Sequence, residues 1–462
     1  MIIKNGECIK VKVDSDTELK TIKYKELLKF FLPLAVMPII IGITHNAINA
    51  SLARLPFPEI TLAVYAVSKS LTNIIKSPIH MSRQIVTSLV DDKESFKLVS
   101  RFVFGLAVFF FLIIASLAYT SLGGLVFKEV IGLKNSQEIK FAYQALSIMA
   151  FIPLVESIRN MMQGLAISLK KTNLITPGVI IRVISISLIL FWATLNQVVS
   201  GVTAASGVWL TGITIEMIFI TLALVYTFGS FKEVFNSLPD DISKKINFKR
   251  IIKFFVPIAI MAFLARFVQP LVQSGIVRTS IGTHDLAAYG VSWTLVLIFV
   301  GPLKQLHQCS LVYARNLNKE NWQRILKFSL AAGTTVSLIL MLLALTELGD
   351  FVLIKLISVS PEITEIVKKV IFAFILFPII KAFRESFWGV MMQRQTTNII
   401  AAAKIVGLIF VILVFLILAL TLEVNAAIIA ALSLTAGEAA DALTISFFVK
   451  KNNILAEVYR EN

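Results

Sequence analysis

The sequence is poor in charged residues. Only 16% of its 462 residues are Asp, Glu, Lys or Arg, while 57% are hydrophobic, and the mean hydropathy is +0.83. A water-soluble globular chain has about 25% charged residues, so this chain has too little polar surface to cover a globule in water. The composition excludes a soluble protein and predicts an integral membrane protein.

The sequence also lacks the motifs of catalysis and of metal binding. Its two cysteines, Cys8 and Cys309, form no CxxC, so neither a disulfide framework nor a zinc site is expected. There is no P-loop, GxSxG or HExxH motif, and the four histidines do not have the spacing of metal ligands. The first residues contain no apolar stretch typical of a signal peptide. We therefore expect no enzyme activity, no cofactor, no metal and no cleaved leader.

Long hydrophobic runs, in contrast, are abundant. A helix that crosses a bilayer needs about 20 apolar residues, and runs of this kind, separated by polar residues, Gly or Pro, recur along the whole chain. They predict an all-α membrane protein with twelve transmembrane helices. The predicted spans are 27–52, 60–89, 98–120, 138–166, 174–197, 202–228, 251–277, 283–313, 324–346, 362–393, 397–421 and 424–449.

Basic residues are distributed unevenly between the predicted loops. One side of the membrane would hold roughly 23 Lys and Arg residues and the other roughly 5. By the positive-inside rule this bias predicts a protein of the cell membrane with both termini in the cytoplasm. Much of the formal charge of +16 is then an orientation signal, and nucleic-acid binding is not needed to explain it.

The two halves of the sequence resemble each other at an offset of about 224 residues. KELLKFFLPLAVM at 25–37 matches KRIIKFFVPIAIM at 249–261, and IPLVESIRNMMQG at 152–164 matches FPIIKAFRESFWG at 377–389. Because six helices per half is an even number, both repeats would enter the membrane from the same side, as parallel repeats of transporters do. We predict an N-terminal segment at 1–26, six-helix halves at 27–228 and 251–450, a cytoplasmic linker at 229–250 and a tail at 451–462.

Many charged residues fall inside the predicted spans. One charge that faces lipid costs about 2.5–3.5 kcal/mol, so ten basic residues would cost roughly 25–35 kcal/mol, more than the stability of about 5–15 kcal/mol of a folded domain. Three basic residues near the cytoplasmic ends, Arg83, Arg182 and Lys404, are expected to snorkel. The deeper ones are expected to line a wet, basic cavity between the halves: Lys69, Lys76, His80, Arg159, Arg266, Lys304, His307, Lys381 and Arg384.

This predicted cavity favours an anion. Pro78 and Pro302 occupy equivalent positions and predict kinks beside the basic residues, and Arg and Lys suit phosphate and carboxylate groups. Glu156 would either form a structural pair with Arg159 or lie in the cavity. The acidic residues of the last helix of each half either bind a coupling Na⁺ or H⁺ or pair with the cations, which the sequence does not separate: Glu216, Glu438 and Asp441.

Several segments resemble a known family. FFVPIAIMAFLARFVQPLVQSGIVR at 254–278 and AGEAAD at 436–441 are similar to elements of the progressive ankylosis (ANK) family, within the MATE-like (MOP) superfamily of exporters and flippases. The resemblance implies a MATE-like fold of two six-helix halves and the export of pyrophosphate, nucleotide or citrate. Compact loops and a composition rich in Ile and Lys favour a bacterial member.

The predicted function is secondary active transport of a small anionic solute by alternating access, by a monomer in the lipid bilayer. Arg266, Lys304, Lys381 and Arg384 are expected to contact the anion. Two alternatives stay open: a cation-coupled multidrug exporter that uses the acidic residues above, and a flippase for a lipid-linked anionic precursor. A membrane scaffold or receptor would not explain a duplicated interior lined with charge.

Overall fold

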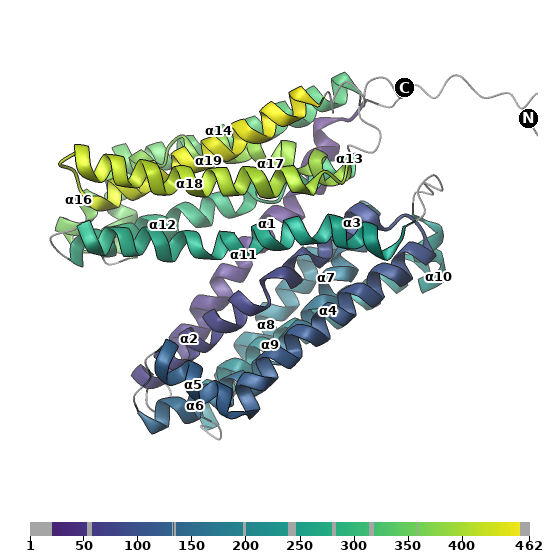
Figure 1. The fold of residues 1–462 in the computed structure, drawn as a ribbon, viewed down its shortest axis with the longest axis horizontal. Coiled ribbons are helices and arrows are strands. Elements are labelled where there is room, and N and C mark those ends of the chain that lie inside the picture. The colour runs from purple at the N-terminus through teal and green to yellow at the C-terminus, as the bar shows by residue number, and fades with distance from the viewer. Residues whose placement is uncertain are drawn as a thin grey trace, which may run out of the picture.

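The computed structural model describes residues 21–52, 58–131, 133, 135–196, 200–238, 246–279, 283–313, 318–357 and 359–452. Within these ranges every regular element is a helix (Figure 1), and nine helices are long and apolar enough, by length and composition, to cross a membrane. Residues 1–20 of the predicted N-terminal segment and 453–462 of the predicted tail lie outside them.

The first six predicted spans are formed by elements that we call the first half. Their bounds are α1 Tyr24–Leu52, α2 Pro58–Ile75, η1 Ser77–Met81, α3 Ser82–Leu89, α4 Lys93–Tyr119, α5 Ser121–Leu125, η2 Val126–Val130, α6 Ser136–Met149, α7 Ile152–Ser168, η3 Thr172–Leu174, α8 Ile175–Asn196 and α9 Gly201–Phe228. A short helix, α10 Phe231–Asn236, follows in the predicted linker.

The last six predicted spans are formed by elements that we call the second half. Their bounds are α11 Phe248–Thr279, α12 Thr283–Leu303, α13 Leu306–Tyr313, α14 Lys319–Leu345, α15 Glu347–Asp350, η5 Phe351–Leu356, α16 Pro361–Ala373, α17 Phe377–Gln393, α18 Thr397–Thr421 and α19 Ala426–Lys451. The fold is therefore the predicted all-α membrane bundle of two six-helix halves.

Two helices begin earlier than their hydrophobic runs predicted. α4 starts at Lys93, where the Asp92 carboxylate accepts a hydrogen bond from the backbone N–H of Ser95 at 2.7 Å. α14 starts at Lys319, where the Asn318 side chain accepts from the backbone N–H of Asn321 at 2.7 Å. These caps satisfy N–H groups that the first turn leaves free. They extend both helices with a polar turn that a count of apolar residues does not include.

Four predicted spans are broken helices, and the breaks lie at equivalent places in the two halves. The helix is interrupted between α2 and η1, next to Pro78, and between α12 and α13, just after Pro302. It is interrupted again before Pro153, between α6 and α7, and before Pro378, between α16 and α17. Proline lacks an N–H and clashes with the preceding turn, so the kinks predicted at Pro78 and Pro302 are confirmed. Irregular backbone at membrane depth is tolerated where it lines a cavity.

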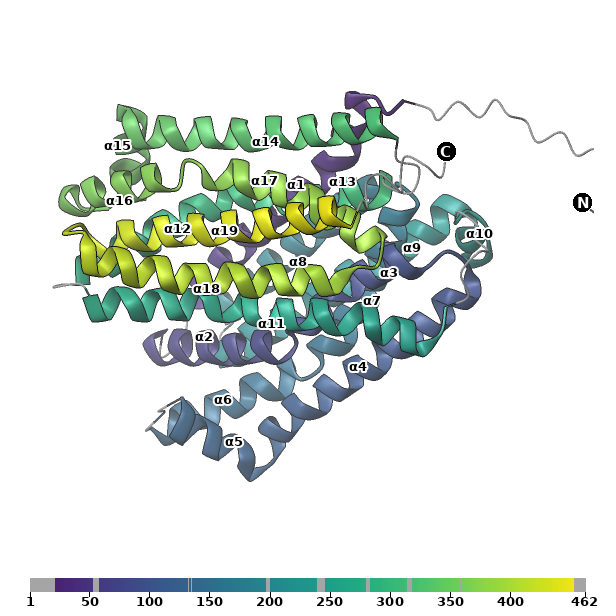
Figure 2. The ribbon, with the colours of Figure 1, turned by 45° about the horizontal axis from the view of Figure 1, so that its top comes forward.

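The two halves meet at one end of the molecule and separate toward the other (Figures 1 and 2). At the end where the described termini lie, which we call the termini end, one hydrophobic core contains residues of both halves, among them Phe31 and Phe255. Toward the opposite end the described residues form two separate cores. One surrounds Tyr65 of the first half and the other surrounds Tyr289 of the second half.

Two equivalent pairs of aromatic rings join the halves at the termini end. Phe31 of α1 packs edge-on against Phe328 of α14, with 5.6 Å between ring centroids. Phe255 of α11 packs edge-on against Phe102 of α4 at 5.1 Å. Phe255 and Phe102 are the repeat equivalents of Phe31 and Phe328, so the first helix of each half closes against the third span of the other half.

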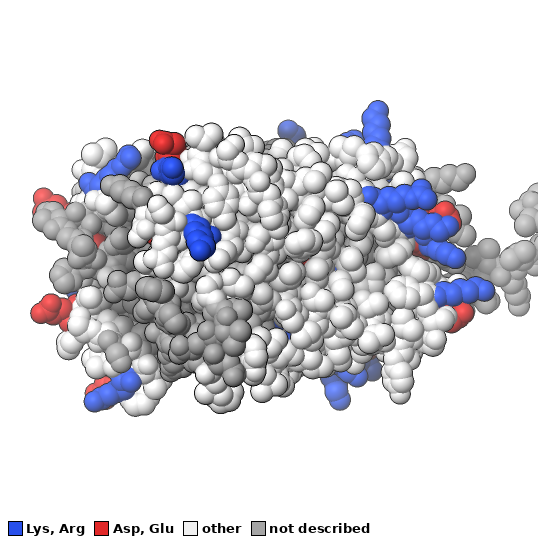
Figure 3. Space-filling model, turned by 90° about the horizontal axis from the view of Figure 1, so that it is seen from below, with Lys and Arg blue, Asp and Glu red and all other residues white. Residues whose placement is uncertain are grey.

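The surface of the molecule fits a bilayer. The face in Figure 3 is largely uncharged across its middle, and Lys and Arg side chains gather at the end from which the termini extend. A continuous uncharged surface is what lipid-facing helices require, because a charge in the hydrocarbon layer is costly.

Candidate functional site

Arg266 of α11 lies where three cavities adjoin. It lines a cavity of about 270 Å³ in the first half, a cavity of about 310 Å³ in the second half, and a third of about 520 Å³ between α2 and α11. We call them the first pocket, the second pocket and the cleft. Because α2 and α11 belong to different halves, the cleft lies between the halves. Lys69 of α2 lines the cleft, with its ammonium 5.6 Å from the centre of the Tyr65 ring.

The first pocket is built around two buried carboxylates. Glu156 of α7, which follows the break before Pro153, forms an ion pair with Lys76 and lies 3.0 Å from the ring nitrogen Nδ1 of His80, both at the break of the second span. It also contacts Arg159, one turn further along α7, at 3.0 Å. A buried carboxylate is costly unless it is paired, so these contacts hold α7 against the broken second span.

The second carboxylate of this pocket belongs to α9. Glu216 contacts Arg159 at 3.3 Å and Arg182 of α8 at 3.0 Å, and it accepts a hydrogen bond from the side chain of Gln163 at 2.8 Å. Three cations, Lys76, Arg159 and Arg182, therefore share two carboxylates in the first half.

In the second half, the acidic residues of α19 face basic residues of α17 and α18. Glu438 contacts Lys381 at 2.9 Å and Arg384 at 3.4 Å. Asp441 contacts Arg384 at 2.9 Å and Lys404 at 3.6 Å. The two carboxylates that the sequence offered as coupling-ion ligands are thus ion-paired, as Glu216 is in the first half.

A third carboxylate of the second half comes from α17. Glu385 contacts Arg384 at 2.6 Å and Lys381 at 3.4 Å, and the His307 ring lies 3.0 Å from it. His307 is buried and belongs to this network, and it is not among the residues that line the second pocket. In the second half, three cations therefore face three carboxylates.

One ion pair is present in both halves. At the repeat offset of 225 residues, Arg159 corresponds to Arg384 and Glu216 to Asp441, and each arginine contacts its acidic residue. The pair joins the fourth and sixth spans of each half. Because the contact is present in both copies, both halves use it to join the same two spans.

The short helices α3, which carries Arg83, and α13, which carries His307, pack in the same way against the fourth span of their own half. Gly164 of α7 packs so closely on α3 that a Cβ there would lie 2.9 Å from the carbonyl oxygen of Arg83. Gly389, the repeat equivalent of Gly164, packs in the same way against the carbonyl oxygen of His307. Only glycine allows this approach, which fixes the backbone at Arg83 beside the first pocket.

The structure corrects two predictions about the basic residues. Arg182 and Lys404 do not snorkel, because both contact carboxylates inside the bundle, and Arg83 lines the first pocket. The basic residues expected in one cavity between the halves are divided between two pockets, since Lys76 and Arg159 line the first and Lys381 the second. Together with Arg384 they make four residues whose charge is compensated. Each of these four contacts a carboxylate of its own half, because neutralisation inside a half is cheaper than burying an unpaired charge: Lys76, Arg159, Lys381 and Arg384.

Three cations at the cavities have no carboxylate within 4.0 Å among the residues that the structure describes. Arg83 lines the first pocket, Lys304 lines the second, and Arg266 lines both pockets and the cleft. Arg266 and Lys304 are exposed, although they lie in the interior of the bundle. A solute in the cavities would meet these three basic side chains, and Lys69 at the cleft.

Comparison with known proteins gives the family. The profile of the progressive ankylosis protein (ANKH) family matches residues 16–285 and 241–458. The chain belongs to the progressive ankylosis protein family. This confirms the resemblance seen in the sequence at Pro257, Arg266 and Gly437.

Solved structures give the fold of this family member. An outward-facing multidrug resistance MATE transporter of the MOP superfamily is 12% identical, with a TM-score of 0.68 over 96% of this chain and 100% of that one. An inward-facing structure is 11% identical, with a TM-score of 0.57 over 93% and 98%. A MOP transporter from Pyrococcus furiosus, described as having a binding pocket of reverse polarity, is 11% identical, with a TM-score of 0.66 over 95% and 99%. These matches show that the chain has the MATE-like fold that the sequence predicted.

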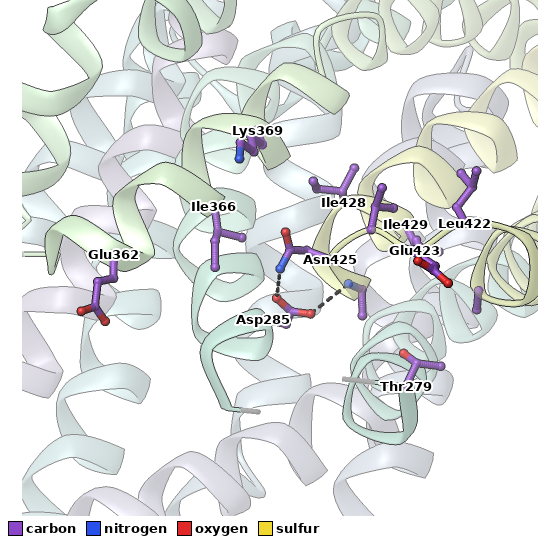
Figure 4. Close-up of a pocket in the computed structure, with 13 residues that line it drawn as sticks. Thr279, Asp285, Glu362, Ile366, Lys369, Leu422, Glu423, Asn425, Ile428 and Ile429 are labelled. Atoms are coloured by element: carbon purple, nitrogen blue, oxygen red, sulfur yellow. Dashed lines mark hydrogen bonds between the residues drawn. The ribbon is translucent and has the colours of Figure 1, made fainter. Parts of the chain in front are cut away.

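Another cavity of this progressive ankylosis family member does not resemble a solute site. It has a volume of about 1040 Å³, lies at the end opposite the termini, and is lined by Asp285, Glu362, Glu423 and Lys369 (Figure 4). The Asp285 carboxylate accepts hydrogen bonds from the Asn425 side chain and from the backbone N–H of Ala426, both at 2.9 Å. Asp285 thus caps the start of α19 and has a structural role.

Sequence reasoning placed Glu385 inside a span without giving it a role, and it misassigned Arg83. Glu385 corresponds to Asn160 in the first half, so the repeat gave no acidic partner at that position. Arg83 was placed near a membrane surface because it lies close to the end of the predicted span 60–89, although a kink was predicted at Pro78. The break at Pro78 was the available signal, since it ends α2 and starts the short helix that carries Arg83.

Proposed function

We propose that this transporter moves a small, multiply charged anion across the cell membrane by alternating access between its two halves. The cargo binds at the cavities around Arg266. The proposal depends on one observation: the described charges at these cavities have an excess of cations, and three of them, Arg83, Arg266 and Lys304, lack a carboxylate partner. A bound anion supplies the missing negative charge.

The family supports this choice of cargo. Progressive ankylosis proteins are associated with export of pyrophosphate, nucleotide and citrate, and each of these carries phosphate or carboxylate groups that Arg and Lys bind well. The Pyrococcus furiosus transporter is described as having a pocket of reverse polarity. Pocket charge therefore differs among proteins with this fold. The charge of this chain's own pockets is a better guide to its cargo than the fold is.

The basic termini end indicates how this conformation is oriented in the membrane. If this end lies in the cytoplasm, as the positive-inside rule predicts, the halves are closed on the cytoplasmic side and apart on the outer side. The higher TM-score to the outward-facing than to the inward-facing structure supports that assignment. In the opposite state the cavities would open to the cytoplasm and accept the anion for export.

A Na⁺ or H⁺ gradient is the proposed driving force. Glu216, Glu438 and Asp441 are the candidate ligands, and each contacts an arginine or a lysine. A coupling ion would therefore compete with these basic side chains. When the ion binds a carboxylate, the basic side chain that was paired with it becomes available to bind the anion. Ion binding and anion binding would therefore be coupled.

The proposal is tested by reconstituting the protein in proteoliposomes. Labelled pyrophosphate, ATP, citrate and a cationic dye are screened, with and without Na⁺ and pH gradients. We expect flux of at least one of the three anions and none of the dye. Dye flux without anion flux would favour the multidrug alternative and contradict the proposal.

Lys304 provides the first variant. Lys304→Gln removes an exposed cation without leaving a carboxylate unpaired, so the protein should fold and lose anion flux by about tenfold, the effect of one charge-assisted hydrogen bond. Lys97→Gln at the surface of α4, where Lys97 contacts Glu94, is the control and should transport normally. Normal flux in the Lys304→Gln variant would remove Lys304 from the site.

A further inference from the structure

The two pockets differ in how completely their charges are compensated. In the first half, Lys76, Arg159 and Arg182 share the carboxylates of Glu156 and Glu216. In the second half, three cations face three carboxylates: Lys381, Arg384 and Lys404 face Glu385, Glu438 and Asp441. Among the described residues, the ion-paired network beside the first pocket therefore has one more cation than carboxylates, whereas the network beside the second pocket is balanced.

One repeat position accounts for much of this difference. Glu438 lines the second pocket, and the residue 225 positions earlier is Ile213, which lines the first pocket. The neighbouring glycines, Gly212 and Gly437, both lie where their helix packs closely on the preceding span, which supports the alignment. The first half thus has an apolar side chain where the second half has a built-in carboxylate.

Arg83 adds a second, independent observation. It lies in the first pocket, and among the described residues its nearest polar partner is the side-chain oxygen of Gln163, at 3.5 Å. Its Nε atom is buried without a hydrogen-bond acceptor. A buried, unsatisfied donor on a charged group is costly, and an anion in the pocket would remove that cost.

We infer that the first pocket is the subsite that binds the anion. Arg83 and Arg266 contact the anion there, and Lys76, Arg159 and Arg182 are positioning residues held by their carboxylates. In the second pocket the carboxylate of Glu438 already supplies a negative charge. Lys304 there would therefore affect passage of the anion, measured as flux, and not its binding in the first pocket. The inference rests on the proposed function, since it assumes an anionic cargo, and it assigns the cargo to one of the two pockets.

The size of the subsite limits what it holds. At about 270 Å³ the first pocket is at the lower limit of small-molecule pockets, about 300–1,000 Å³. It fits a compact anion, or one charged group of a larger one whose remainder lies in the cleft. Asn73 and Arg266 line both spaces, so such a ligand would pass between them at these residues.

The test replaces Ile213 by the acidic residue that the second half has at the equivalent position, Glu438. Ile213→Glu gives the first pocket the carboxylate that the second pocket has, and Ile213→Gln has nearly the same shape without the charge. Pyrophosphate and citrate binding to the purified full-length protein is measured by equilibrium dialysis, and folding by size-exclusion chromatography. For whichever anion the wild type binds, we expect Ile213→Glu to bind at least about tenfold more weakly than Ile213→Gln.

Arg83 gives a second readout if Ile213→Glu fails to fold. Arg83→Gln should weaken binding of the same anion by about tenfold, and Arg83→Lys should weaken it less because the charge remains. Equal binding by Arg83→Gln and wild type, or by Ile213→Glu and Ile213→Gln, would overturn the assignment to the first pocket while leaving anion transport standing. If the wild type binds neither anion and shows flux of none of the three anions screened above, the proposed function fails, and this inference with it. If it transports ATP alone, the same comparisons are made with ATP.

Discussion

At the scale of single residues, the buried charges fall into two groups with different roles. Residues such as Arg159 and Arg384 contact carboxylates on neighbouring helices and hold these helices together. Arg266 and Lys304 face cavities without such a partner among the described residues. Variants in the first group should affect stability, and variants in the second should affect transport.

The duplicated ion pair gives a direct test of the first group. Arg384→Gln leaves Asp441 and Glu385 less compensated in the interior, and breaking a buried pair costs about 3–5 kcal/mol. We therefore expect a clear loss of thermal stability in detergent. Arg384→Gln combined with Asp441→Asn should lose less than the sum of the two single variants. Additive losses would show that the pair contributes nothing as a pair.

The sequence could predict which charges lie inside the bundle but not how they are paired. Insertion cost places Lys381 and Glu438 away from lipid, whereas their contact depends on the rotation of α17 and α19 about their axes. That rotation is set by close packing at positions such as Gly437, which single-sequence reasoning does not resolve. The sequence could therefore predict that these charged residues avoid lipid, but not which of them pair with carboxylates.

At the scale of helices, the lengths of the hydrophobic runs predicted the spans well, and prolines predicted where two of the spans are broken. Pro78 and Pro302 both mark ends of helices at the depth of the pockets. Caps such as Asp92 shift a start by several residues, because a polar first turn is invisible to hydropathy. The closed contact at the termini end was not predicted, since it depends on aromatic residues that also suit a lipid-facing helix.

One contact at the termini end is expected to control opening there. The backbone N–H of Ile22, just before α1, donates to the Asn321 side chain of α14 at 2.8 Å, and Arg324 donates to the carbonyl oxygen of Ile22 at 3.2 Å. Asn321→Ala removes one of these bonds, worth about 0.5–1.5 kcal/mol. The population open at this end should rise about two- to tenfold.

Spin labels at Lys171 and Lys319, exposed residues of the two halves at this end, report the opening as a longer distance between the labels. Asn236→Ala is the matched control, because the Asn236 side chain bonds to Glu233 of its own short helix. An unchanged distance distribution in Asn321→Ala would show that this contact does not hold the end closed.

At the scale of the whole molecule, the protein is a duplicated bundle whose halves share a fold and differ in charge. The repeat is visible in the sequence because both copies keep the residues that pack and bend helices, such as Pro153 and Pro378. The charged positions differ: Glu156 corresponds to Lys381, and Ile213 to Glu438. The packing residues therefore gave the fold, while the function depends on positions where the halves diverged.

The most direct test of anion transport reverses the charge of Arg266, the residue that lines both pockets and the cleft. It then asks whether the protein transports an anion or a cation. Flux of labelled pyrophosphate and of a cationic dye is measured in parallel in proteoliposomes with wild-type protein and with Arg266→Glu. We predict pyrophosphate flux by the wild type and its loss in Arg266→Glu. Undiminished pyrophosphate flux in Arg266→Glu, or wild-type flux of the dye alone, would contradict an anionic cargo at this site.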